Sequence, residues 1–574
     1  MAELAIGAVV ERLDIERAWL VDPVSWREGP GEIVVRGGRL ESVSWLRGAA
    51  ARGVRPGGML VLPGLLDIHV HLREPGNEDA ETVATGLAAA AHGGFTTVAA
   101  MPNTSPAADD PAVLARVRAA AAASGSPVEL LLHGAVTAAR AGERLAALGE
   151  LADAGAVGFS DDGAAVKTAV LLRNALLYLG AFGLPIFEHA EDPGLTAGAE
   201  AHEGVVAAIL GLRGWPVAGE ETAVARDLAV LAAVVPDAPA ARLHLTHLST
   251  APALDLVRRA KAAGLPVTCD VTPHHLALTD EWVAGARRWS WEALDGDGAV
   301  RDPWADGALV AHPYATAAKV NPPLRSAEHA AAVLAALVDG TADAVATDHA
   351  PHRAVDKETE FGLAANGISG IETALSVLLA AVAAGRLPLL RAVAALTTGP
   401  AAVLGARAGR RGAARGLVEG APADLVVVDA GDRWTVTADA LRSLGKNSPL
   451  LGRDLPGRVL LTVAGGRLGY RDAGAAYGAP RTAHRCPATL SHPGRPSQAP
   501  SPAPPAMLRG QVTRSGPGRR RPTRWNQRRM PARRRPAAPP GSEPRTRRGS
   551  GRRGRSATVR RPRPPHRLSA GRCR

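Results

Sequence analysis

The stretch Asp67–Gly76 reads DIHVHLREPG and directly follows an apolar run, residues 59–66, that is typical of a buried strand. Side chains alternate between the two faces of a strand, so His69 and His71 point to the same side. Two neutral imidazoles on one face can bind a single divalent cation. Arg73 continues that face and offers a fork of hydrogen-bond donors suited to a carboxylate. The alternative is a pair of solvated loop histidines, and the rest of the chain decides between the two.

The charge of the chain is unevenly distributed. The last hundred residues, 475–574, hold 26 Lys and Arg against one acid, Glu543, whereas residues 1–474 carry 41 basic and 54 acidic groups. The tail is rich in Arg and Pro and poor in aliphatic residues, so we predict that it is disordered. Its arginines would bind nucleic acid only non-specifically, through phosphates. The first 474 residues have the charge of an ordinary acidic soluble protein.

The number of cysteines and the length of the apolar runs indicate the cellular compartment of the protein. The three cysteines, Cys269, Cys486 and Cys573, are too few for a disulfide framework and suit a reducing, cytoplasmic compartment. No run of ~18 apolar residues occurs, so we expect no transmembrane helix. With 46% apolar residues, the chain can build a large core.

Four segments follow from the sequence pattern. Residues 1–58 and 403–474 contain short β-like runs, and neither end alone has enough strands for a stable sheet. We therefore predict that they pair into one small β-sandwich domain. Residues 59–402 form a larger domain inserted between them, and residues 475–574 form the tail.

The inserted domain alternates strand and helix patterns, which implies a parallel sheet covered by helices and most simply a (β/α)8 barrel of the TIM type. An open doubly wound sheet is the structural alternative. The eight predicted strands are Met59–Leu72, Thr96–Asn103, Val128–Thr137, Ala156–Asp162, Pro185–Asp192, Arg242–Thr250, Pro266–Pro273 and Ala342–Pro351.

Residues 281–318 interrupt this alternation after the seventh strand. The segment contains Trp282, Trp289, Trp291 and Trp304 and is too long for a plain connection. It is either a lid, an assembly surface or a surface excursion without function.

Polar residues gather where the predicted strands end, which in a barrel is where catalytic groups lie. The fourth strand ends in FSDDG (159–163), the fifth in FEHAED (187–192), the sixth in HLTHLST (244–250) and the eighth in TDHAPH (347–352). With His69 and His71 they predict a metal centre at one end of the barrel. Nitrogen and oxygen donors without sulfur fit one or two Zn²⁺ ions best. Asp348 can bind a metal and also carry a proton, which amide hydrolysis requires.

Seven motifs in order across residues 1–474 resemble the amidohydrolase superfamily, and in particular the bacterial class I dihydroorotases. They are DIHVHLREPG (67–76), MPNT (101–104), FSDDG (159–163), THLST (246–250), VTPHHL (271–276), NPPLR (321–325) and ATDHAPH (346–352).

The resemblance implies a role for each site residue. It implies metal ligands at His69, His71, Asp162, His189, His247 and Asp348. Asp162 would bridge two zinc ions where hydantoinase-like relatives use a carboxylated lysine, and Asp348 would be the general base and then the general acid. The residues implied around the substrate are His71, Arg73, Asn103, Asn321, His352, Asn366 and Gly367. Residues 363–366 depart from the simplest family pattern before Gly367.

The implied activity is the zinc-dependent, reversible hydrolysis of (S)-dihydroorotate to N-carbamoyl-L-aspartate in pyrimidine biosynthesis. A homo-oligomer, with aspartate transcarbamoylase as a further partner, would be in keeping with the family. A hydantoinase, dihydropyrimidinase or allantoinase is the nearest rival, but Arg73 and Asn103 suit a substrate carboxylate and Asp162 replaces the modifiable lysine. A non-catalytic partner of aspartate transcarbamoylase is the second rival, and such a chain would be expected to lack the metal ligands.

Overall fold

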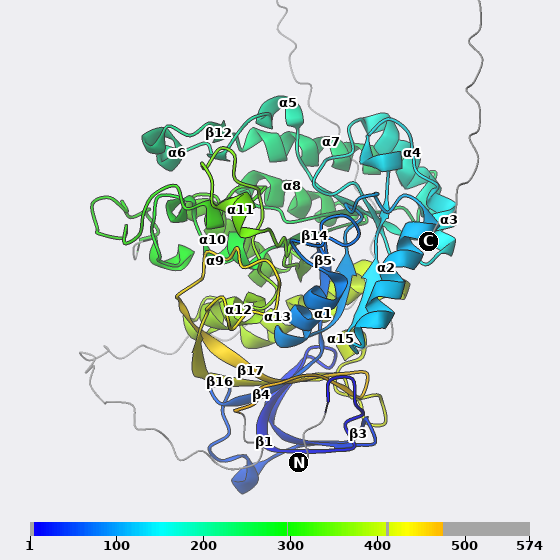
Figure 1. The fold of residues 1–574 in the computed structure, drawn as a ribbon, viewed down its shortest axis with the longest axis vertical. Coiled ribbons are helices and arrows are strands. Elements are labelled where there is room, and N and C mark those ends of the chain that lie inside the picture. The colour runs from blue at the N-terminus through cyan, green and yellow to red at the C-terminus, as the bar shows by residue number, and fades with distance from the viewer. Residues whose placement is uncertain (1–4, 295–296, 409–411, 475–574) are drawn as a thin grey trace, which may run out of the picture. The chain divides into compact units, whose positions relative to one another are not determined.

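The computed structural model describes residues 5–294, 297–408 and 412–474 (Figure 1). The predicted disordered tail, with its non-specific contact to nucleic acid, lies outside the described residues.

Strands from both ends of the described chain pair in one seven-stranded sheet in the order β18-β17-β16-β4-β1-β2-β3. Long runs of β-branched and aliphatic residues, buried at alternate positions, form these strands. Their division into the two layers of a sandwich stays a prediction. The strands are β1 (Arg12–Asp22), β2 (Arg27–Arg36), β3 (Arg39–Trp45), β4 (Met59–Pro63), β16 (Leu425–Thr435), β17 (Asp454–Ala464) and β18 (Arg467–Arg471).

The predicted single strand 59–72 is divided at Gly64. Residues before it form β4, which pairs with β1 and β16 in the seven-stranded sheet, and residues after it begin a parallel strand. The prediction of one strand was wrong because both halves are continuous apolar runs, and the pattern of buried residues alone does not separate them. The Gly64 N–H donates to Asp424 O, and a Cβ on Gly64 would lie 2.2 Å from Thr96 Oγ1.

Eight parallel strands follow in chain order, and each overlaps one of the eight predicted strand segments, which confirms their number and order; only the segment 59–72 is divided. Each pairs with the next, β7 and β8 being separated by His133 alone, and a parallel bridge between Val70 and His349 sets the last beside the first. They are β5 (Leu65–Val70), β6 (Phe95–Ala100), β7 (Glu129–Leu132) with β8 (Gly134–Ala135), β9 (Phe159–Ser160), β10 (Pro185–Glu188), β13 (Arg242–Leu245), β14 (Val267–Val271) and β15 (Ala344–Val345).

Helices alternate with these strands and lie outside them (Figure 1). Their ends carry local signals: Thr82 and Thr85 form a capping box at the start of the first helix, and Asp110 caps the second, which ends at a left-handed Gly125. The longer helices are α1 (Val83–His92), α2 (Pro111–Ser124), α3 (Leu148–Asp153), α4 (Ala169–Gly180), α6 (Val205–Leu210), α7 (Ala218–Val234), α8 (Ala251–Ala262), α10 (Ala327–Asp339), α12 (Ala374–Ala383), α13 (Leu389–Ala395) and α14 (Thr398–Leu404). The shorter elements are α5 (Pro193–Thr196), α9 (Pro273–Ala277), α11 (Ala354–Lys357), α15 (Gly412–Arg415) and the strand pair β11 (Ala201–His202) and β12 (Gly214–Trp215).

The seven-stranded sheet packs on helices of the parallel-stranded part. Thr462 Oγ1 of β17 donates to Ala91 O of α1 at 2.7 Å, and Ser376 Oγ of α12 donates to Gly457 O of β17 at 3.0 Å. Among the residues that the structure describes, one apolar helical stretch, Leu389–Arg407, is long and apolar enough to cross a membrane, and 61% of its most apolar window is buried inside the structure.

Gly64→Ala is predicted to lower the free energy of unfolding by about 2 kcal/mol, because the new methyl group overlaps the buried, branched side chain of Thr96. Gly57→Ala is the control, since a Cβ there meets no atom within 4 Å and should change stability by less than about 0.5 kcal/mol. Denaturant unfolding of both variants measures the difference, and equal stabilities would contradict the close packing at this junction.

Candidate metal centre and substrate cleft

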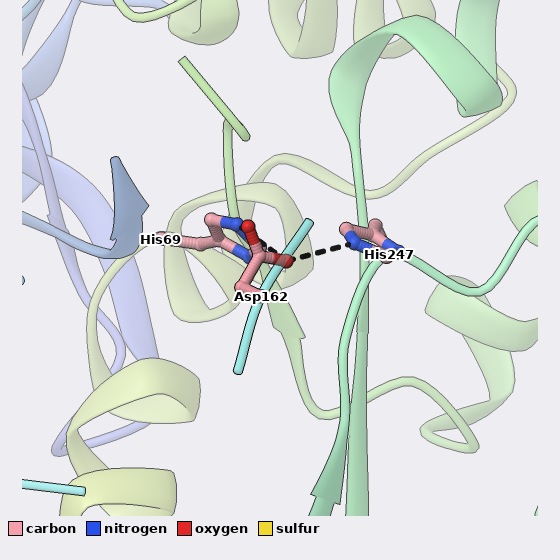
Figure 2. A group of neighbouring side chains, drawn as sticks. All are labelled: His69, Asp162 and His247. Atoms are coloured by element: carbon pink, nitrogen blue, oxygen red, sulfur yellow. Dashed lines mark ion pairs between the residues drawn. The ribbon is translucent and has the colours of Figure 1, made fainter. Parts of the chain in front are cut away.

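One buried carboxylate lies among four imidazoles. Asp162 Oδ1 is 3.3 Å from His69 Nε2, 3.6 Å from His189 Nδ1 and 3.5 Å from His247 Nε2, and Asp162 Oδ2 is 3.4 Å from His71 Nε2. Figure 2 shows His69 and His247 turned toward this carboxylate from separate strands. The five groups come from the ends of four parallel strands, so residues that are far apart in sequence converge here.

A second carboxylate completes the cluster. Asp348 Oδ1 is 3.0 Å from His71 Nε2 and 3.5 Å from His69 Nε2. Two triads have ligand atoms within 4.8 Å of one another, namely His69 with Asp162 and His247, and His69 with His71 and Asp348. The structure therefore brings all six predicted metal ligands together.

The cluster fits a divalent cation. Both ring nitrogens of His69 and Asp162 Oδ1 are buried without a hydrogen-bond partner in the described chain, which is costly unless something else binds them. Donors held at the zinc–nitrogen distance around one tetrahedral ion are ~3.3 Å apart, close to the separations found here. The donor set of imidazole nitrogens and carboxylate oxygens is one that Zn²⁺ and related divalent ions accept.

The close contacts within the cluster shift the pKa values of its carboxylates and imidazoles. Burial alone would lower the pKa of His69, but the carboxylates of Asp162 and Asp348 outweigh it and raise the pKa to about 9. Burial opposes the shift at His189 also, where Asp162 and Glu191 raise the pKa to about 10. Burial raises the pKa of Asp162, and the surrounding imidazoles reverse this and hold it well below its usual range. In the absence of a cation, His69 and His189 therefore carry protons at neutral pH.

Neighbouring groups orient the ligands. Asn103 Oδ1 accepts from His71 Nδ1 at 2.9 Å, which leaves Nε2 of His71 free to face the two carboxylates. The carboxylate of Asp270 accepts a hydrogen bond from the backbone N–H of His247 at 2.7 Å, and the carboxylate of Asp67 accepts one from the backbone N–H of His69 at 3.1 Å. Asp67, two residues before His69, thus holds the backbone of that ligand.

Glu191 contacts the cluster but was not among the site residues predicted from the sequence. Its Oε2 lies 2.9 Å from His189 Nε2 and accepts from Asn321 Nδ2 at 2.9 Å. Its position two residues after His189, on the same face of an extended segment, was the signal that could have found it. Asp348, His247 and Arg73 have φ of 45°, 40° and 60°, left-handed conformations that non-glycine residues adopt at functional sites.

An open cleft with a volume of about 210 Å³ reaches the cluster. All seven residues predicted around the substrate line it: His71, Arg73, Asn103, Asn321, His352, Asn366 and Gly367. None of the described residues of 281–318 lines it, so a lid over this cleft is not seen there. Instead, Trp282 is fully buried, and the guanidinium of Arg453 lies over the Trp289 ring at 3.9 Å, so the segment packs against the rest of the protein. It contains the short helices η3 (Asp280–Trp282), η4 (Ser290–Glu292) and η5 (Thr316–Ala318).

The chain resembles known proteins over most of its length. A family model described as dihydro-orotase-like matches residues 58–251. A dihydroorotase of Anaeromyxobacter dehalogenans (strain 2CP-1) is 46% identical over 462 residues, which are 80% of this chain and 98% of the relative. One from Pelotomaculum thermopropionicum is 41% identical over 463 residues, or 80% of this chain and 99% of the relative.

Among solved structures, an L-hydantoinase from Arthrobacter aurescens superposes with a TM-score of 0.63 at 26% identity, covering 80% of this chain and 96% of that one. A dihydropyrimidinase from Brevibacillus agri gives a TM-score of 0.60 at 20% identity over 80% of this chain and 95% of that one, which is a likeness of fold alone. Fold and site together define the class, the hydrolases of cyclic amides. Within that class the chain belongs to the dihydroorotase family.

Metal binding is predicted to release protons. In the metal-free protein His69 and His189 are protonated at neutral pH, because their pKa values lie near 9 and 10, and both must lose that proton to bind a cation. The apparent affinity for Zn²⁺ should therefore fall as pH is lowered from 9 to 6. Titration calorimetry in buffers of different ionisation enthalpy measures the released protons, and a binding heat independent of the buffer would contradict the prediction.

Proposed function

We propose that this protein is a zinc-dependent dihydroorotase, which catalyses the reversible hydrolysis of (S)-dihydroorotate to N-carbamoyl-L-aspartate in pyrimidine biosynthesis. The observation that carries the proposal is one cleft lined by both the His/Asp cluster and a half-buried arginine, Arg73. The first is suited to the scissile amide and the second to the carboxylate that distinguishes this substrate from a hydantoin. Curated dihydroorotases at 40–46% identity over 80% of the chain support it.

Arg73 supplies the preference for a carboxylate. Its Nε donates to Pro351 O at 3.1 Å, and it has no ion-pair partner in the described part of the chain. A half-buried guanidinium without a carboxylate partner favours an anionic ligand, and its planar fork can bind both oxygens of a carboxylate. His352 lies beside it at 3.4 Å and is neutral at pH 7, because burial, with Arg73 nearby, lowers its pKa to about 4.

The proposed chemistry divides between the two sides of the cleft. A bound divalent cation would supply polarisation of the ring carbonyl and activation of water. Asp348 would take a proton from the attacking water and return it to the leaving ring nitrogen. Asn103 keeps His71 in the tautomer that presents Nε2, and Asn321, held by Glu191, borders the ring. Arg73 binds the distal carboxylate and so fixes the ring relative to the cluster.

Several finer features belong to this proposal. The eight parallel strands and the Val70–His349 bridge support a closed (β/α)8 barrel that extends to about residue 402. Because β4 pairs within the seven-stranded sheet, the boundary predicted at 59 moves to Gly64, and the small β-sandwich would then comprise residues 1–63 and 403–474. A cytoplasmic homo-oligomer, with aspartate transcarbamoylase as a further partner, completes the proposal. Retention of all six ligands argues against a non-catalytic partner.

The proposal is tested by metal analysis and turnover of the purified protein on dihydroorotate and on hydantoin. We expect one or two zinc ions per chain and hydrolysis of dihydroorotate alone. Hydantoin as the better substrate would move the assignment to the hydantoinases, and absence of bound metal in an active enzyme would overturn the zinc centre.

Asp348→Asn is predicted to lower kcat by about a thousandfold, since the amide cannot accept the proton of the attacking water. The fold should persist, and His69→Ala should lose metal as well as activity. Asp343→Asn is the matched control at the opposite end of the same strand, where Asp343 contacts Lys261, and it should keep normal turnover. Near-normal kcat in Asp348→Asn would remove the proton-transfer role.

Arg73→Lys should raise KM for dihydroorotate by about tenfold or more with a smaller change in kcat, because an ammonium cannot bind both carboxylate oxygens in one plane. Arg242→Lys, which alters a guanidinium bound to Ala402 O and Val403 O, is the control and should leave KM unchanged. Steady-state kinetics measure both variants, and an unchanged KM in Arg73→Lys would exclude carboxylate binding there.

A further inference from the structure

A segment far from the parallel strands in sequence packs behind residues that line the cleft. Residues 441–447 belong to the connection from β16 to β17 of the seven-stranded sheet, and they contact the loop that follows β15. A Cβ on Gly445 would lie 2.6 Å from Pro351 Cβ and 2.7 Å from His352 N, so this backbone packs directly behind His352. The carboxylates of Glu372 and Glu81 hold the segment by accepting from the backbone N–H groups of Arg442, Ser443 and Leu444.

Asn447 joins two loops that line the cleft. Its Nδ2 donates to Ala350 O and to Gly367 O, each at 3.0 Å. Its Oδ1 accepts from His352 N at 2.8 Å and from Ser369 Oγ at 3.0 Å. Two carbonyls require the donor end and an N–H requires the acceptor end, so the orientation of this amide is determined. The residue is 8% exposed, and its side-chain amide forms all of these hydrogen bonds with the two loops.

Lys357 binds the same carbonyl from another side. Its buried Nζ donates to Gly367 O at 3.1 Å, to Lys319 O at 3.1 Å and to Ala365 O at 2.7 Å. The Gly367 N–H in turn donates to Lys319 O at 3.0 Å. The carbonyl oxygen of Gly367 thus accepts from Lys357 and Asn447, and its N–H donates to Lys319 O, so both of its backbone groups are hydrogen-bonded to residues that do not line the cleft.

The position of Gly367 matters for the substrate side. Its backbone lies against the His352 ring, because a Cβ at this position would be only 2.8 Å from His352 Nε2. Its φ of 147° is also a conformation that favours glycine. Next to it Asn366 O lies 2.8 Å from His352 Nε2. A shift of the loop would therefore move His352, which borders Arg73.

We propose that Asn447 and Lys357 are positioning residues of the substrate cleft, which hold the Gly367 loop so that it orients His352 beside Arg73. The inference rests on the proposed function for the identity of the substrate. Neither side chain lines the cleft itself, so their effect passes through Gly367 and His352. Specificity at the carboxylate end then depends on a segment of the smaller sheet domain.

The test uses the metal-loaded full chain with Asn447→Leu and Lys357→Met, which keep approximate volume and remove the donors. Each should raise KM for dihydroorotate by about tenfold while kcat stays within about threefold and zinc content is unchanged. Hydrogen exchange at residues 366–370 should rise in both. Arg391→Met is the matched control, because Arg391 also binds two backbone carbonyls, Leu337 O at 2.6 Å and Ala342 O at 2.8 Å, and does not line the cleft.

The control should lose thermal stability while KM and exchange at 366–370 stay at the wild-type level. Unchanged KM in a folded Asn447→Leu or Lys357→Met variant, or an equal rise in the control, would overturn the positioning role. If Asn447→Leu does not fold, Lys357→Met decides. A wild-type protein that fails to hydrolyse dihydroorotate would instead overturn the proposed function, and the exchange measurement would then decide the positioning role by itself.

Discussion

The site depends on one buried carboxylate, Asp162, held between imidazoles that come from separate strands. An ion pair of this kind is costly to bury, and its separations of 3.3–3.6 Å are too long for good hydrogen bonds. A cation placed among these groups would satisfy Asp162 Oδ1 and the ring nitrogen of His69 together. The rest of the structure can be understood as the means of keeping these groups aligned and of bringing a carboxylate-bearing ring to them.

Alignment is achieved by polar groups behind the ligands. Asp270, Asp67 and Asn103 each bond a ligand histidine through its backbone or its outer ring nitrogen. Such partners limit the freedom of the imidazoles and help to set which ring nitrogen faces the cation. Asn447, on the segment that connects β16 to β17, bonds Ala350 O and His352 N behind the cleft in a comparable way. Both ends of the substrate would thus meet preorganised groups.

The sequence predicted the parallel-stranded part well because its signals are local. Each strand is a short apolar run that ends in a polar motif, and strand ends in such folds meet at one edge, so His69 and Asp348 could be placed together without coordinates. Gly64 was missed because β4 and β5 are equally apolar, and only pairing partners distant in the chain separate them. Asn447 and Glu191 were missed for a related reason, since a single polar residue acquires its role only from neighbours that the fold supplies.

The most direct test of the metal centre is a crystal structure of the zinc-loaded protein with anomalous data at the zinc edge. The account predicts anomalous peaks about 2.0–2.1 Å from imidazole nitrogens of His69 and His247 and within bonding distance of the Asp162 carboxylate. A protein that binds zinc only at other residues, or that leaves Asp162 unliganded while active, would contradict it.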